Sequence, residues 1–148
     1  AEDGIRDRDV TGVQRVLFRS VRMLIHRLFT LPSGDSAIEL REVPLSAGAR
    51  PMSETFPAEH LFFRETPQGH VQHFHNAPRR QLIFITSGLL EIETSTGERW
   101  TCRPGDILFT EDFEGAAHIT RSLRDVRGFL HVVMPDDFTV TDWPLVNR

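Results

Sequence analysis

The sequence contains no lysine and no tyrosine, and it has a single cysteine. Without lysine, the chain cannot form a Schiff base with a carbonyl substrate or supply the lysine of a phosphate-binding P-loop. Without tyrosine, it has no phenolic acid or base. The lone Cys102 excludes an internal disulfide and a cysteine-based metal site. Because it lies in an apparent strand, it is expected to be a small packing residue rather than a nucleophile.

The overall composition is that of an ordinary globular domain. Hydrophobic residues make up 39% and charged residues 26% of the 148 residues, which suits one domain with a real core. The net charge of −4 argues against nucleic acid or an anionic membrane as a partner. No apolar run approaches the length of a membrane span, and nothing reads as a secretory signal. We therefore expect a cytoplasmic protein that acts on a small molecule.

The first twenty residues differ from the rest of the chain. Residues 1–20 alternate charges without joining the strand pattern that follows, and they resemble a translated sequencing-adapter remnant. Such a segment is excluded from reasoning about the fold, as an expression scar would be. We expect residues 1–22 to be a non-native extension and residues 23–148 to form the single domain, with Met23 a plausible natural start.

From there the chain reads as short strands separated by turns, with hardly any helix. Glycine and proline mark turns at residues 32–35, 94–97 and 103–106, and the prolines between 44 and 57 predict a loop. Such a series of strands predicts an all-β sandwich or barrel. The expected strands are Leu24–Phe29, Ser36–Val43, His60–Glu65, Val71–His75, Gln81–Thr86, Leu89–Thr94, Glu98–Arg103, Ile107–Thr110, Ala117–Ser122 and Gly128–Met134.

Histidines at three positions indicate the chemistry. His73 and His75 are two apart on an expected strand and so point to the same face. If the later strand that carries His118 lies alongside, three imidazoles converge inside a small barrel. Three imidazoles at one point are what a divalent metal needs. Gln81 shares a strand face with Ile83 and is expected to point into the same barrel.

These residues resemble the two motifs of the cupin family, a double-stranded β-helix (jelly-roll) barrel. His73 and His75 fit the first motif's H-x-H, Gln81 with Gly88 fits its E-x6-G, and Gly115-x2-His118 fits the second motif. The resemblance covers roughly residues 71–122. The chain departs from the family where a glutamine replaces the glutamate, the spacing between His75 and Gln81 is longer, Phe113 replaces a proline and Ser122 replaces an asparagine.

The resemblance implies a small cupin that binds a divalent transition metal (Fe, Mn, Ni, Cu or Zn) and acts on a small organic substrate. The expected ligands are His73, His75 and His118, with Gln81 as a fourth ligand or as a group that orients a histidine or a water. Oxygenase, isomerase and lyase chemistries all occur in the family, and the fold does not choose among them. Cupins often pair through outer strands, so a homodimer is also implied.

Two other functions stay open. One is a metal-free dehydratase or isomerase in which His75 or His118 moves protons, aided by Asp112. The other is a module that binds a small molecule without turnover. Arg80 is a candidate for binding a substrate carboxylate or phosphate, and His131 for lining the pocket.

Two groups of side chains are expected to be structural. The acidic residues of 111–114 are expected to be solvated in a turn, with Arg79 or Arg80 pairing with them at the surface. Four phenylalanines are expected to fill the core rather than to stack on a ligand: Phe62, Phe63, Phe74 and Phe84.

Overall fold

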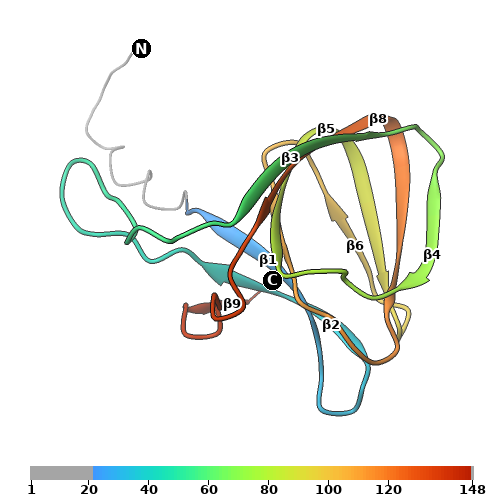
Figure 1. Ribbon diagram of the computed structural model, residues 1–148, viewed down its shortest axis with the longest axis horizontal. Helices are drawn as coiled ribbons and strands as arrows, with labels where there is room; N and C mark the ends of the chain where they lie inside the picture. The colour runs from blue at the N-terminus through green and yellow to red at the C-terminus, as the bar shows by residue number, and fades with distance from the viewer. Residues whose placement is uncertain (1–21, 148) are drawn as a thin grey trace.

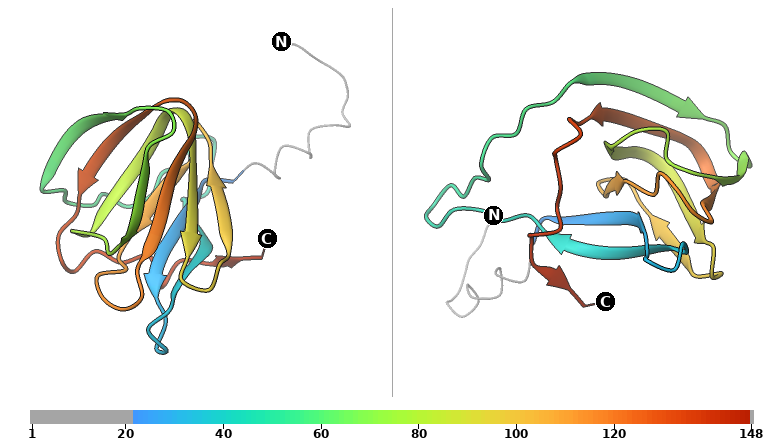
Figure 2. Two further views of the ribbon diagram at one scale, coloured as in Figure 1. Left: turned by 90° about the vertical axis from the view of Figure 1, so that its right-hand side faces the viewer. Right: turned by 60° about the horizontal axis from the view of Figure 1, so that its bottom comes forward.

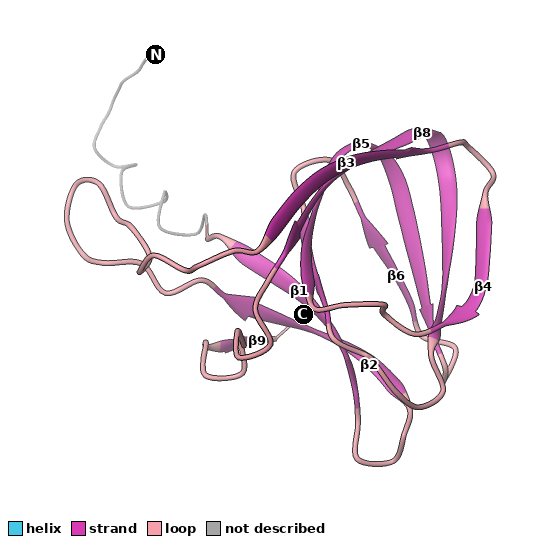
Figure 3. Ribbon diagram, viewed as in Figure 1, coloured by secondary structure: helices cyan, strands magenta, loops and turns pink. Residues whose placement is uncertain are grey.

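The computed structural model describes residues 22–147, and within them the protein is built from strands and loops alone (Figure 3). The all-β prediction is thus confirmed, and these residues contain no helix long and apolar enough to span a membrane. Residues 1–21 of the expected N-terminal extension lie outside the described part. The nine strands are β1 (Leu24–Thr30), β2 (Ser36–Glu42), β3 (His60–Thr66), β4 (Val71–His75), β5 (Gln81–Thr94), β6 (Arg99–Cys102), β7 (Ile107–Thr110), β8 (His118–Val133) and β9 (Leu145–Val146).

The strands form a jelly-roll barrel in which β5 and β8 belong to both walls (Figures 1 and 2). Residues 81–87 of β5 and 128–133 of β8 pair with each other, flanked by β7, β1 and β2 on one side and by β3 on the other. Residues 89–94 of β5 and 118–124 of β8 also pair, flanked by β6 and β4. Each long strand therefore passes from one wall of the barrel to the other.

Both long strands bend where the sequence predicted a break. The register between β5 and β8 shifts repeatedly between Ile85 and Leu90, and Gly88 there has φ +75°. A Cβ on Gly88 would lie 2.9 Å from the backbone of Arg127, so glycine is required both for the dihedral and for the close approach. Four of the expected strands thus merge into two, because a bulge bends a strand without ending it.

The other predicted elements lie close to their expected positions. Residues 43–59 contain no strand, as the prolines predicted. The three predicted turns are present, each with a backbone hydrogen bond donated by Gly34, Gly97 or Asp106. Only the two-residue strand β9 has no counterpart among the expected strands. It pairs with β2 at the edge of the sheet.

Two hydrophobic clusters hold the barrel together. One lies between the walls and includes Leu28, Ile92 and Cys102, all fully buried. Burial raises the pKa of the Cys102 thiol to about 12, so the expected packing role is confirmed. The second lies on the outer side of the wall that contains β7, β1 and β2. There Phe138 and Val140 of the C-terminal segment pack against Phe109.

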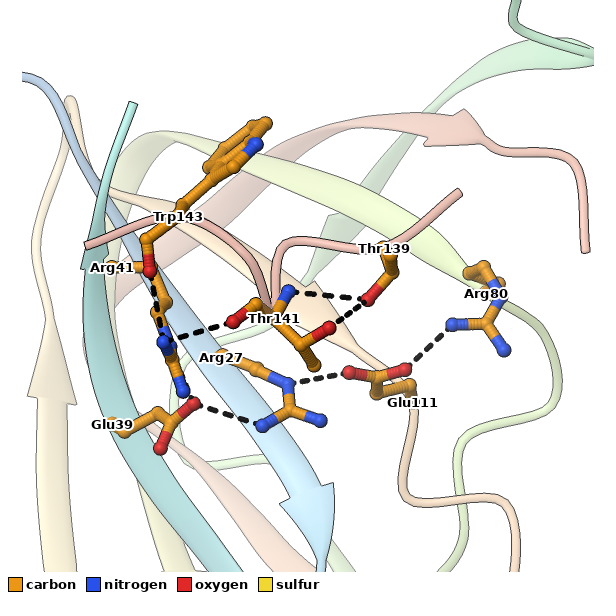
Figure 4. Close-up of polar contacts among 8 residues, drawn as sticks. All are labelled: Arg27, Glu39, Arg41, Arg80, Glu111, Thr139, Thr141 and Trp143. Carbon is orange, nitrogen blue, oxygen red and sulfur yellow. Dashed lines mark hydrogen bonds and ion pairs between the residues drawn. The ribbon is translucent and has the colours of Figure 1, made fainter. Parts of the chain in front are cut away.

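A chain of ion pairs runs from β2 across β1 to Glu111 and Arg80 (Figure 4). Arg27 pairs with Glu39 at 2.8 Å and with Glu111 at 2.5 Å, and Glu111 also accepts a hydrogen bond from Arg80 at 2.6 Å. Arg41 joins Glu39 and donates to the backbone carbonyl of Trp143. The network ties the C-terminal segment and the end of β7 to the β1–β2 hairpin.

Candidate functional site

The barrel encloses a cavity of about 120 Å³. Three histidines (His75, His118 and His131), three arginines (Arg64, Arg79 and Arg127) and Gln81 line it together with apolar side chains. Since a water molecule needs roughly 10–15 Å³ of such space, the cavity holds a ligand of roughly ten non-hydrogen atoms.

His118 forms a buried pair with Asp112. The Nδ1–H group of His118 donates to Oδ2 of Asp112 at 2.5 Å, and the residues are 4% and 0% exposed. A carboxylate in this position fixes the tautomer and orientation of the ring, and it leaves Nε2 as the atom available to a ligand. The expectation that the acidic segment is solvated is wrong for Asp112, because the loop turns its side chain inward.

The loop between β7 and His118 is held against the β1–β2 hairpin. Ala116 N–H donates to the carbonyl of Gly34 at 2.8 Å, and the hydroxyls of Thr30 and Ser36 donate to the carbonyls of Glu114 and Ala117. Gly115, with φ +88°, lies directly on the Gly34 carbonyl. Contacts with the hairpin, which is distant in sequence, thus set the positions of both members of the Asp112–His118 pair.

His75 lies beside His118, with the ring centroids 4.3 Å apart. The Nδ1–H group of His75 donates to the carbonyl of His73 at 2.8 Å, which leaves Nε2 unprotonated when the ring is neutral. Burial, the largest influence, lowers the pKa of His75 below the ordinary value of 6.5, and the neighbouring His118 lowers it further. The hydrogen bond to the His73 carbonyl raises the pKa by less than burial lowers it. His75 is therefore neutral at pH 7.

His73 lies outside the cavity lining. The pairing of β4 with β8 shifts between Gln72, opposite Thr120, and His75, opposite His118. Three residue steps on β4 thus match two on β8, so an irregularity at 73–74 breaks the alternation that would place His73 and His75 on one face. Gln72 and His75 line the cavity, whereas His73 is exposed.

The three-histidine cluster expected from the sequence is not assembled. Among residues 22–147, no group of three or more His, Cys, Asp or Glu side chains is placed to hold a metal ion. Two imidazoles come together at His75 and His118, and Gln81 is engaged elsewhere: its Oε1 accepts from Nδ1 of His131 at 2.9 Å. The donor set therefore does not fit a three-imidazole metal centre.

His131 lines the cavity, as the alternation of β8 predicted. With Nδ1 donating to Gln81, its Nε2 is a buried acceptor without a hydrogen-bond partner. Its ring stacks on Phe62 with centroids 4.4 Å apart. Burial, followed by the charges of Arg64, Arg79 and Arg127, lowers the pKa of His131 to about 4, so the ring is neutral at pH 7.

The arginines that reach the cavity differ from the one the sequence suggested. Arg80 is bound to Glu111, as expected for one of the two adjacent arginines, and does not line the cavity, whereas Arg79 does. Arg64 on β3 and Arg127 on β8 were not predicted. The alternation of Arg127 with Phe129 and His131 indicated that Arg127 faces the interior. It was not used, because an arginine in a strand usually faces solvent.

The four phenylalanines expected in the core differ in how far they are buried. Phe63 and Phe74 are 78% and 56% exposed, so the expectation is wrong for both. Phe62 is half-buried and stacks on the ring of His131, which lines the cavity. Phe84 is half-buried on β5.

The fold and the cavity define an all-β barrel whose cavity combines histidine and arginine side chains with apolar ones. No family model matches the chain, and no curated protein matches it. Among solved structures, it is similar to the conserved SPY1581 protein of unknown function from Streptococcus pyogenes, at 18% identity over 55% of this chain and 81% of that one, with a TM-score of 0.40.

Two further structures cover more of the chain. A putative ethanolamine utilization protein Q (EutQ) from Salmonella typhimurium is 14% identical over 79% of this chain and 99% of its own, with a TM-score of 0.37. A protein of unknown function from Rhizobium leguminosarum is 15% identical over 88% of this chain and 99% of its own, with a TM-score of 0.34. Since these scores are low, the function of this chain is inferred from its own residues.

Proposed function

We propose that the protein is an enzyme that transfers protons on a small organic molecule bound in the barrel, as an isomerase or a dehydratase does. The observation that supports this proposal is the buried Asp112–His118 pair beside His75. A histidine oriented by a carboxylate is a common general base, and a second neutral imidazole next to it supplies another proton acceptor.

The chemistry follows from which nitrogen atoms are free. Nε2 of His118 accepts a proton from a C–H or O–H group of the substrate, and the electron pair of the broken bond stays on the substrate. The carboxylate of Asp112 stabilises the imidazolium that forms. The proton then returns to a different atom of the substrate or to a leaving hydroxyl. His75, held through Nδ1, leaves its own Nε2 as a second proton acceptor on the neighbouring ring.

The test is proton exchange measured by NMR in D2O. The protein is incubated with a panel of small hydroxy and oxo compounds, both neutral and anionic. We expect deuterium to enter a carbon position, or the compound to be converted, for at least one of them. Because the pKa of His75 is lowered, this ring stays a neutral proton acceptor below pH 6.5, so protonation of His75 should reduce the rate only below that value.

Two variants make this test specific. His118→Asn is expected to abolish the exchange, whereas His60→Asn, which changes an exposed histidine at the start of β3, should leave it unchanged. A panel in which no compound exchanges, or a His118→Asn variant that exchanges at the original rate, contradicts the proposal.

A second candidate function is supported by the same two rings. In both His75 and His118 the Nδ1 atom is hydrogen-bonded to an oxygen and Nε2 is left over, which is how metal-ligating histidines are usually held. Elemental analysis of protein purified without chelator tests this. Stoichiometric Fe, Mn, Ni, Cu or Zn that disappears in His118→Ala would support a bound metal, and a metal-free preparation would contradict it.

A further inference from the structure

Arg127 is a buried cation without a counterion. It is 5% exposed, and its Nε and Nη1 atoms make no hydrogen bond. In the described part of the chain it forms no ion pair, and its guanidinium lies 4.5 Å from the ring centroid of Phe129. Burial and the neighbouring Arg64 lower its pKa only to about 10, so it is charged at pH 7. A buried charge of this kind is costly unless a ligand compensates it.

Two more guanidinium groups approach the same part of the cavity. Arg64 and Arg79 line it, and both lie 5.8 Å from the ring centroid of Phe62, the ring that stacks on His131. Among the described residues that line the cavity, none is an aspartate or a glutamate. The positive charges therefore face a space in which the protein supplies no negative partner.

His131 adds a second requirement at this place. Its Nε2 is a buried hydrogen-bond acceptor without a partner, because Nδ1 already donates to Gln81. A ligand that satisfies His131 must bring a donor, such as a hydroxyl group. The unsatisfied atoms of Arg127 and His131 thus call for two different groups on one molecule.

We propose that the cavity binds a small hydroxy carboxylate, with the carboxylate held by Arg127 and Arg64 and a hydroxyl donating to Nε2 of His131. A guanidinium donates strong, charge-assisted hydrogen bonds to a carboxylate, and the Nε and Nη1 atoms of Arg127 are both without a partner in the protein. This inference rests on the proposed function, for which it names the class of substrate. The cavity, about 120 Å³, has room for a molecule of the size of malate.

Calorimetric titration with four probes tests the charge and the hydroxyl separately. L-malate and succinate differ only in one hydroxyl, inorganic phosphate supplies a different anion, and glycerol supplies hydroxyls without charge. We expect malate to bind about five- to tenfold more tightly than succinate, the effect of one hydrogen bond to a buried acceptor. Glycerol should not bind. Binding of phosphate alone, or equal binding of malate and glycerol, overturns the proposal.

Variants of the two ligand-binding residues give a sharper test. Arg127→Met is expected to weaken malate binding about 100-fold and, because it removes an uncompensated buried charge, to raise the melting temperature of the free protein by about 2–5 °C. Arg124→Met, on an exposed arginine of the same strand, is the matched control and should change neither. A destabilised Arg127→Met with unaltered malate binding would show that Arg127 is structural and overturn the proposal.

The hydroxyl contact is tested by His131→Phe, which keeps an aromatic ring against Phe62. This variant should bind malate and succinate equally well, and a preserved preference for malate overturns the assignment of the hydroxyl to His131. His118→Asn separates the inference from the proposed function. It should lose proton exchange yet still bind malate, so failure of the binding prediction and failure of the catalytic one are distinguishable.

Discussion

Replacing Asp112 by asparagine is expected to lower the turnover of the proposed proton transfer by about 10³- to 10⁴-fold. Asparagine preserves the size of the buried side chain but carries no charge to stabilise an imidazolium at His118. Its amide can also donate to Nδ1, which would place the ring proton on Nε2 and remove the base. Turnover in the exchange assay and the melting temperature are measured on the same preparation.

The control for this variant is another acid of the same loop. Glu114 is exposed, and its backbone carbonyl rather than its side chain accepts from Thr30. Glu114→Gln should therefore exchange protons at the original rate. If Asp112→Asn folds and keeps a turnover close to that of the unaltered protein, the Asp112–His118 pair is structural and the proposed mechanism fails.

Gly115→Ala is expected to lower the free energy of unfolding by about 3 kcal/mol or more. At φ +88° an alanine is strained, and its Cβ would overlap the carbonyl oxygen of Gly34. To relieve this overlap the loop must move away from the β1–β2 hairpin, which breaks the hydrogen bond from Ala116 to Gly34. Urea denaturation measures the loss of unfolding free energy. The rate in the proton-exchange assay should decrease as well, because the same loop carries Asp112.

Gly69→Ala separates the two causes. Gly69 has nearly the same dihedral, φ +85°, but a Cβ there meets no atom within 4 Å. This variant carries only the conformational strain, about 1 kcal/mol. Equal losses in the two variants would mean that contact with the hairpin does not hold the loop in place.

The sequence predicted the strands well and their continuity poorly. Alternation and turn residues located all strands except the short β9. One expected strand ended at Thr86 and the next began at Leu89, yet neighbours on both sides carry β5 through a bulge at Ser87 and Gly88. Tertiary pairing, which decides between a turn and a bulge, cannot be read from local composition.

The candidate site was predicted in part. The spacing of His75 and His118 placed them together correctly, and alternation placed Gln81 and His131 inside. His73 was misplaced because a single irregular step on β4 reverses its face. Asp112 was named as an aid to proton transfer in one alternative, but the acidic segment was expected to be solvated, and only the packing of the loop on the hairpin turns this carboxylate inward.

The sharing of β5 and β8 by both walls has a consequence for recognition. Arg127 and His118 lie on the same strand, β8, on either side of its bend, and β5, which begins at Gln81, pairs with β8 on both sides of that bend. The groups proposed to hold the anion and those proposed to move protons are thus carried by one pair of strands that the sheet holds on both sides of the bend. A ligand entering this interior meets a preorganised set of contacts, so little ordering entropy is lost on binding.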